Sequence, residues 1–278
     1  MPFKRYTQIC KYLHLVDNAT ADTRDLLHKV KYVIDYVNEK FPYLYVPEQD
    51  IAIDESLMKF RGALSFIQYN PSKRARFGLK YYKMCESVSG YCVQFRIYAG
   101  KKIGDAQLPS SDAIVMELMT PYLSKGYTLF LDNWYSSPLL YQRLQEGGTN
   151  VLGTVRTNRK QMPPHFKTLK LKKGEVEAQF SHKMMALKWQ DKKPVCILST
   201  MHDSAEMTST RKRRSTATVM KPLPVVEYNK GMGGVDKMDQ QLASFPLMRR
   251  YLKGYNFISL ICVFSIHTAC TKKSPKRI

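Results

Sequence analysis

The chain has 278 residues, of which 44% are hydrophobic, and this is enough apolar material for one large domain or two smaller ones. It carries 44 lysine and arginine residues against 23 acidic ones, a formal net charge of +21, which indicates a polyanionic partner, most often nucleic acid, with an anionic membrane surface as the weaker alternative. No run of about 18 apolar residues, no hydrophobic signal core and no CxxC pair occurs, so we expect no transmembrane span, no His/Cys metal site, and reduced thiols in an intracellular protein.

Helices and then strands are predicted in the first hundred residues. Apolar residues at helical spacing predict that residues 1–47 are mainly helical, and Pro47 ends this region. The apolar period then changes to that of strands. Four β-rich runs separated by short turns predict a meander of antiparallel strands, over residues 51–58, 64–69, 78–87 and 91–100.

Helices and strands alternate in the next part of the chain. A Ser-Ser-Asp sequence predicts a capped helix over residues 113–123, and a Ser-Pro pair opens a second helix over residues 138–146, which a pair of glycines ends. Strands are predicted over residues 125–133 and 150–156. This order predicts a mixed α/β layout in which helices cover a sheet.

The chain becomes strongly basic after the last of these strands. From Thr157 to Lys221, fifteen Lys or Arg residues stand against five acidic ones, a local net charge of +10. We interpret this stretch as an inserted basic module or a long excursion. Its run RKRRS, at 211–215, is open to three interpretations: a nuclear localisation patch, a DNA clamp, or a solvated loop, which base rates favour. A glycine-rich turn then leads into a helix.

Four aspartates lie at positions where a carboxylate is expected to be paired or to bind a metal. Asp54 lies inside the first strand, and alternation places it on the face opposite Ile53, where a half-buried carboxylate costs free energy unless it is paired or binds a metal. Asp132 ends an apolar strand, at the kind of position where α/β sheets place ligand sites. Asp236 follows the glycine-rich turn, and Asp239 lies on the same helical face.

Carboxylates from two strands and one helix suit Mg²⁺, which prefers oxygen ligands, and two such ions about 4 Å apart support phosphodiester chemistry. Each aspartate also has a structural interpretation. Asp132 could be a cap or turn residue, Asp54 could pair with an arginine, and the helix pair could interact with the helix dipole. Trp134 and Tyr135 could line a DNA groove, but packing of at least one of them under the adjacent helix is favoured.

Three long blocks of the sequence carry a family resemblance. Residues 51–91, beginning IAIDESLMKFRG, residues 129–163, beginning LFLDNWYSSPLL, and residues 229–240, NKGMGGVDKMDQ, resemble in this order the conserved blocks of piggyBac-type transposases and of the piggyBac transposable element-derived proteins. The likeness runs from about Phe3 to residues 264–275, nearly the whole chain.

The resemblance implies an RNase H-like catalytic core of the DDE/D superfamily, a mixed sheet flanked by helices. The family's three catalytic aspartates, which also bind the metal, match Asp54, Asp132 and Asp236, and Asp239 matches a supporting acid. The implied cofactor is Mg²⁺, two ions per active site, with Mn²⁺ as a substitute.

The resemblance also implies a division of the chain. A helical dimerisation and DNA-binding domain is built from both termini, and a basic insertion domain splits the catalytic core. The expected parts are the helical segment 1–49, the first part of the core 50–157, the insertion 158–217, the last core helix 218–240, and a helical remainder 241–278.

The implied activity is metal-dependent DNA cleavage and strand transfer in DNA transposition, in the nucleus, by a homodimer that acts on transposon ends and a TTAA-type target in double-stranded DNA. Residues expected to bind DNA are Lys73, Arg74, Arg76, Arg211, Lys212, Arg213 and Arg214.

The chain departs from the family pattern at its ends, where no Cys/His-rich zinc module is visible, and we expect a truncated chain. One alternative is therefore a domesticated or truncated transposase-derived protein that binds DNA without catalysis. A third and weaker interpretation is a basic structural or RNA-binding protein whose many aromatic residues stack on bases.

Overall fold

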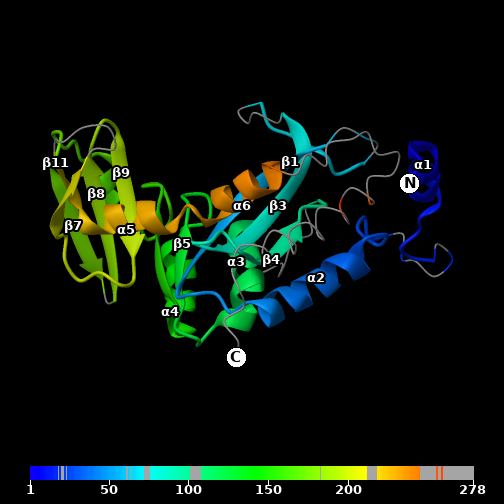
Figure 1. Cartoon of the computed structure of the whole chain (residues 1–278). Helices are drawn as coiled ribbons and strands as arrows, with labels where there is room; N and C mark the ends of the chain where they lie inside the picture. Colours follow the sequence, from blue (N-terminus) through cyan, green and yellow to red (C-terminus); the bar gives the residue numbers. More distant parts are fainter. Residues whose placement is uncertain are drawn as a thin grey trace.

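The structure is a computed structural model, and it describes residues 1–17, 19, 22, 24–60, 62, 64–71, 76–100, 108–181, 183–211, 218–244, 255 and 258. A long mixed sheet runs through the molecule, with helices on both of its faces (Figure 1). None of the helices in these ranges has the length and apolar character needed to cross a membrane.

The N-terminal region contains two helices, α1 (Phe3–Tyr12) and α2 (Lys31–Leu44), as the sequence predicts. The apolar pattern extends several residues further toward the N-terminus than α2 does. Those residues form turns instead, because the Asp25 carboxylate accepts a hydrogen bond from the backbone N–H of Leu27 and competes with helix formation.

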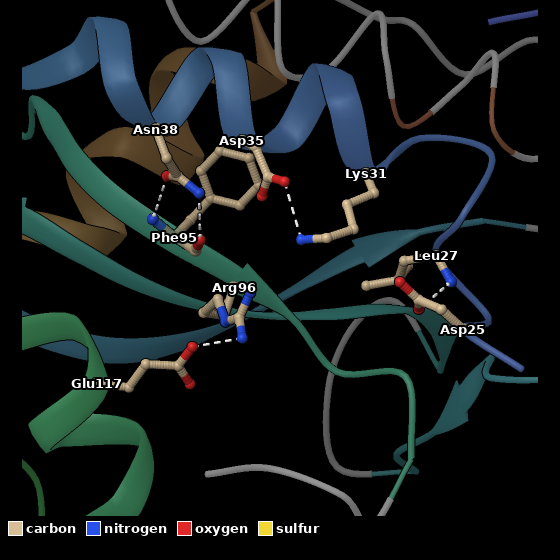
Figure 2. A network of polar contacts seen from close by, with 8 residues as sticks. All are labelled: Asp25, Leu27, Lys31, Asp35, Asn38, Phe95, Arg96 and Glu117. Atoms are coloured by element: carbon tan, nitrogen blue, oxygen red, sulfur yellow. Dashed lines mark hydrogen bonds and ion pairs between the residues drawn. The ribbon is translucent and has the colours of Figure 1, made fainter. Parts of the chain in front are cut away.

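Helix α2 packs along strand β4 (Cys92–Ile97), and polar contacts fix this packing (Figure 2). The Asn38 side chain donates to the carbonyl of Phe95 and accepts from its N–H, each at 3.0 Å. Arg96, the next residue on β4, forms an ion pair with Glu117 of helix α3 (Ser110–Met119). Helices α2 and α3 are thereby both attached to β4 of the central sheet.

The four β-rich runs correspond to β1 (Asp50–Lys59), β2 (Gln68–Tyr69), β3 (Phe77–Glu86) and β4. The predicted antiparallel pairing is confirmed, because β1, β2 and β4 all pair antiparallel with β3, but the meander order is wrong for β2, since β1 pairs with β3 and not with β2. Only β2 is much shorter than its apolar run.

Two parallel strands follow, β5 (Thr128–Leu131) and β6 (Asn150–Thr154), with β5 paired to both β1 and β6. Helix α3 continues into a short 3₁₀ turn (Thr120–Tyr122), and helix α4 (Pro138–Glu146) is capped by Ser137, whose hydroxyl accepts from the N–H of Leu140. The cap predicted for α3 is wrong. Pro109 is at the cap position, and Asp112 is buried in the first turn, where its carboxylate accepts from the Ser137 hydroxyl.

The basic stretch after β6 extends the same sheet. It forms a 3₁₀ turn (Pro164–Lys167), strands β7 (Val176–Ser181), β8 (Met184–Gln190) and β9 (Pro194–Ser199), and a separate ribbon of β10 (Met207–Arg211) and β11 (Thr218–Pro222). Strand β9 pairs antiparallel with β6, so the order along the sheet is β2-β3-β1-β5-β6-β9-β8-β7, with β4 on β3. The division into domains stays a prediction.

Two helices complete the described fold, α5 (Leu223–Gly231) and α6 (Gly234–Ala243). The sheet is buried on both faces: Ala52 and Phe130 pack in one cluster with Val225 of α5, whereas the neighbouring Ile53 and Leu131 belong to a larger cluster that includes α3 and α4. Most of the predicted helical remainder 241–278 lies outside the described residues.

Candidate active site

The parallel pairing of β1 with β5 brings two of the predicted aspartates together. Ile53 lies opposite Leu131, so Asp54 and Asp132 each stand one residue further along, beside the carboxyl-terminal end of β5, while β1 itself continues to Lys59. Both share the face of Ala52 and Phe130, because side chains alternate along a strand. Ala52 and Ile53 belong to different core clusters, which agrees with the alternation that predicts Asp54 opposite Ile53.

Helix α6 brings the third aspartate to this edge. Two glycines at its start permit close packing: a Cβ on Gly231, the last residue of α5, would lie 2.3 Å from ring carbons of Phe130, and one on Gly234, the first residue of α6, would lie 2.8 Å from the carbonyl oxygen of Glu86. The helix therefore presses against the sheet, with Asp236 exposed in its first turn. Gly231 and Gly234 thus allow the close approach of the two helices to the sheet.

The three carboxylates influence one another electrostatically. Burial, together with the negative charges of Asp132 and Asp236, raises the pKa of Asp54 to about 6 from 3.8, although the N–H of Glu55 donates to its carboxylate at 2.7 Å. Burial also raises the pKa of Asp132, against the N–H groups that follow it and the positive charge of Arg156, which lower it. At both carboxylates, burial thus outweighs the groups that stabilise the charged form.

Asp239 has a different environment from the other three. Its Oδ1 accepts from Lys83 Nζ at 2.7 Å and from Ser56 Oγ at 2.8 Å, and the Lys83 side chain is 3% exposed. Asp239 is therefore paired with a buried cation, and its contacts fix α6 on β1 and β3. In this geometry Asp239, the predicted supporting acid, anchors helix α6 to the sheet.

The donor set at this edge fits a hard divalent cation. Carboxylate oxygens are the ligands that Mg²⁺ prefers, and a cation would offset both the burial and the neighbouring negative charges that raise the pKa of Asp54. In the described part of the chain, no three acidic, histidine or cysteine side chains are already close enough to enclose a metal ion. Asp54, Asp132 and Asp236 are the residues that would hold it, after side-chain adjustment.

Aromatic residues support the loop that carries Asp132. Trp134 stacks on Tyr82 with ring centroids 6.0 Å apart, and Lys80 Nζ lies 5.0 Å from the centre of the Trp134 ring. Tyr135 is completely buried. Packing, the favoured interpretation for at least one of these residues, is confirmed for Tyr135.

Sequence reasoning missed two arginines that brace this loop. Arg156 Nε donates to the Asn133 side chain at 3.1 Å, and Arg159 donates to the backbone carbonyls of Asn133 and Trp134. Their position directly after a strand parallel to that of Asp132 was the available signal. Lys83 was missed as well, since a lone lysine in an apolar strand gives no indication of its partner.

The residues predicted to bind DNA are described only in part. Arg76 is exposed just before β3, and the backbone of Arg211 ends β10. Five others lie outside the described residues, namely Lys73, Arg74, Lys212, Arg213 and Arg214.

Comparisons with known proteins agree with this architecture. The family model described as Transposase IS4 matches residues 1–266. Human PiggyBac transposable element-derived protein 2 is 26% identical over 288 residues, covering 95% of this chain and 47% of that protein, and human PiggyBac transposable element-derived protein 3 is 26% identical over 273 residues, covering 93% and 46%. The chain thus spans about half the length of the curated relatives it matches.

A solved structure is similar along the whole chain. The cryo-EM structure of a piggyBac transposase synaptic complex with hairpin DNA aligns with a TM-score of 0.82 and 25% identity, covering 100% of this chain and 60% of that one. The expected RNase H-like fold, a mixed sheet flanked by helices, is confirmed by this match. The chain belongs to the Transposase IS4 family, and its relatives place it on the piggyBac branch of that family.

Proposed function

We propose that this chain is the catalytic part of a piggyBac-like transposase, which cleaves DNA with a divalent metal and transfers the resulting strand ends in DNA transposition. The observation that carries the proposal is the meeting of Asp54, Asp132 and Asp236 from two parallel strands and one helix, close enough for two of them to raise the pKa of the third.

In the proposed mechanism Asp54, Asp132 and Asp236 hold Mg²⁺ at the edge of the sheet, two ions in the full site, with Mn²⁺ as a substitute. Bound metal supplies activation of the attacking water or 3′-hydroxyl and stabilises the leaving oxygen. The chain itself orients the groups: the N–H of Trp134 donates to Asp132 at 2.8 Å, and the glycine-packed α6 sets the position of Asp236. The exposed Arg156, beside Asp132, is suited to bind a phosphate of the substrate.

The proposed substrate is double-stranded DNA, at transposon ends and at a TTAA-type target. A net charge of +21 and the similarity to a transposase solved with hairpin DNA support this partner. We further propose a homodimer and a nuclear location, and we retain Arg76, Arg211 and the five undescribed basic residues as candidate DNA contacts.

The test is nicking of a labelled DNA duplex with Mg²⁺ or Mn²⁺, with chelation as one control and Asp132→Ala as the other. We expect metal-dependent nicking that falls at least about 100-fold in Asp132→Ala, Asp54→Ala and Asp236→Ala, since each removes a metal ligand. Asp22→Ala, an exposed acid far along the chain from these residues, serves as the matched control and should retain activity.

Two results would count against the proposal. Nicking that persists in Asp132→Ala would show that Asp132 is not a catalytic metal ligand. Binding of DNA by the wild-type chain without cleavage under either metal would instead support a transposase-derived DNA-binding protein.

A further inference from the structure

The active-site edge of the sheet continues beyond the catalytic strands. Strands β5 and β6 end at this edge, and β9 runs antiparallel to β6, with Thr154 opposite Ile197, so β9 begins there. Strand β8 ends at the same edge, because Gln190 lies opposite Pro194, and β7 begins there. The β8–β9 turn and the segment entering β7 are therefore at the same end of the strands as Asp132.

Both of these connections carry adjacent exposed lysines. Lys172 and Lys173 lie in the turn before β7, and Lys192 and Lys193 lie in the turn between β8 and β9. The two turns are neighbours, because Gly174 N–H donates to the carbonyl of Gln190 at 2.7 Å. In the described part of the chain none of these four lysines forms an ion pair. We refer to the four residues as the lysine turns.

The acidic residues beside the lysine turns leave this charge available. The Glu175 carboxylate accepts a hydrogen bond from the backbone N–H of Lys172 at 2.7 Å, and this contact closes the turn while the side chains of Lys172 and Lys173 stay exposed. Gly174, at φ +90°, completes the turn. Asp191 is half-buried, whereas Lys192 and Lys193 are exposed. The turns thus have defined backbone geometry and a net positive outer surface.

The spacing along this edge matches a DNA duplex. Neighbouring strands lie about 4.8 Å apart, so the two to four strand intervals from β5 to the β8–β9 turn and to β7 place the lysine turns roughly 10 to 20 Å from Asp132 along the sheet. A duplex rises about 3.4 Å per base pair, so this corresponds to about three to six base pairs. Arg156, at the end of β6, lies between the two regions.

We propose that the lysine turns bind the phosphate backbone of duplex DNA that flanks the bond cleaved at Asp54 and Asp132, about half a helical turn away. The proposal rests on the proposed function for the identity of the cleaved strand. Its observations are the shared sheet edge, the unpaired exposed ammonium groups and the spacing. Phosphate contacts of this type add affinity without sequence preference.

The experiment compares three variants with the same loss of charge: Lys172→Gln/Lys173→Gln, Lys192→Gln/Lys193→Gln, and the control Lys125→Gln/Lys183→Gln. The control lysines are also exposed but lie at the opposite edge, before β5 and in the β7–β8 turn. Binding to a labelled duplex that is long enough to span the whole edge is measured by fluorescence anisotropy over a series of salt concentrations. Metal-dependent cleavage is measured on the same samples.

Each lysine-turn variant should weaken binding and reduce the slope of log K against log salt by up to about 1.8, since each lost phosphate contact contributes about 0.9. The control pair should change the slope by less than half of this. An equal change of slope in the control pair would show that the effect comes from net charge alone. An unchanged slope in both lysine-turn variants would show that the lysine turns do not contact the DNA. If the lysine-turn variants bound duplex RNA more weakly but bound duplex DNA as the wild type does, the proposal would also be overturned.

These failures are distinguishable from failure of the proposed function. If the wild-type chain cleaves DNA and Asp132→Ala does not, the catalytic assignment stands whatever the lysine variants do. If the wild-type chain neither binds nor cleaves DNA, both proposals fall.

Discussion

Lys83 Nζ lies 2.7 Å from Oδ1 of Asp239, and this contact joins helix α6 to strand β3 beside the candidate active site. Lys83 is opposite Asp54 on the neighbouring strand, and Asp239 is one helical turn after Asp236. Because β3 pairs with β1, the contact holds α6, which carries Asp236, in register with the strand that carries Asp54.

Removing Lys83 alone should destabilise the protein more than removing Lys83 together with the charge of Asp239. We expect Lys83→Met to lower the free energy of unfolding by about 1 to 3 kcal/mol, because Asp239 loses its cation while remaining partly solvated. The double variant Lys83→Met/Asp239→Leu should recover part of this loss. Urea unfolding of both variants measures the coupling, and additive effects of the two substitutions would contradict it.

Asp54→Asn should stabilise the metal-free protein at neutral pH. The folded-state pKa of Asp54, about 6, exceeds the unfolded value of 3.8, so its contribution to stability is complete below pH 3.8 and is lost as pH rises through about 6. Removing the charge at pH 7 should therefore raise the free energy of unfolding by about 1 to 3 kcal/mol, together with loss of cleavage. Thermal unfolding in a chelator checks the sign.

The same pair of proteins tests the metal. Mg²⁺ should stabilise the wild-type chain by mass action and have a smaller effect on Asp54→Asn, which lacks one ligand. Equal stabilisation of both proteins by Mg²⁺ would place the bound ion elsewhere.

Gly231→Ala should disrupt the packing of α5 and α6 on the sheet. A Cβ there would meet the Phe130 ring at 2.3 Å, which is well inside van der Waals contact, and overpacking of this kind costs about 1 to 3 kcal/mol. Gly233→Ala is the matched control in the same turn, because its Cβ would meet only the end of Lys237 at 3.9 Å. Thermal unfolding should separate the two, and equal effects would argue against the close approach.

His202 should make the protein less stable in acid. It lies between Ser199, 2.7 Å from Nδ1, and Glu227, 3.1 Å from Nε2, and burial lowers its pKa below 6.5 despite the nearby charges of Glu227 and Asp203. The contribution of the neutral ring is complete above pH 6.5 and is lost as pH falls through the folded-state pKa.

His202→Gln should therefore flatten the decline in unfolding free energy between about pH 7 and pH 5. His165→Gln, which removes a histidine outside this network, is the control and should leave the decline unchanged. A His202→Gln profile that still parallels the wild type would show that other groups govern the acid limb.

Much of the order of helices and strands along the chain could be predicted from the local sequence pattern. The period of two in the run around Asp54 and the Ser-Pro start of α4 are local signals, and the structure agrees with both. The length of β2 and the start of α2 could not be predicted, because hydrogen bonds such as that from Leu27 N–H to Asp25 compete with the apolar pattern. The pairing of β9 with β6 depends on contacts between distant residues, which the pattern does not contain.

The candidate site divides in the same way. Asp54, Asp132 and Asp236 each follow a recognisable local element, and the resemblance brings them into one set. The anchoring of Asp239 by Lys83, which is 156 residues away in sequence, is a tertiary contact between a strand and a helix. No spacing rule could have indicated it.

Backbone pairing between β6 and β9 makes the catalytic strands and the strands of the basic stretch one continuous hydrogen-bonded plate. Such a plate twists but does not hinge, so the far strands cannot swing over the carboxylates like a lid without breaking several hydrogen bonds. Any substrate seated on the far strands is presented to the carboxylates at a set offset. Selection of the cleaved bond would then depend on a molecular ruler built into the fold, and inserting or deleting residues between Lys160 and Lys170, in the connection from β6 to β7, would leave that offset unchanged as long as the ladder itself survives.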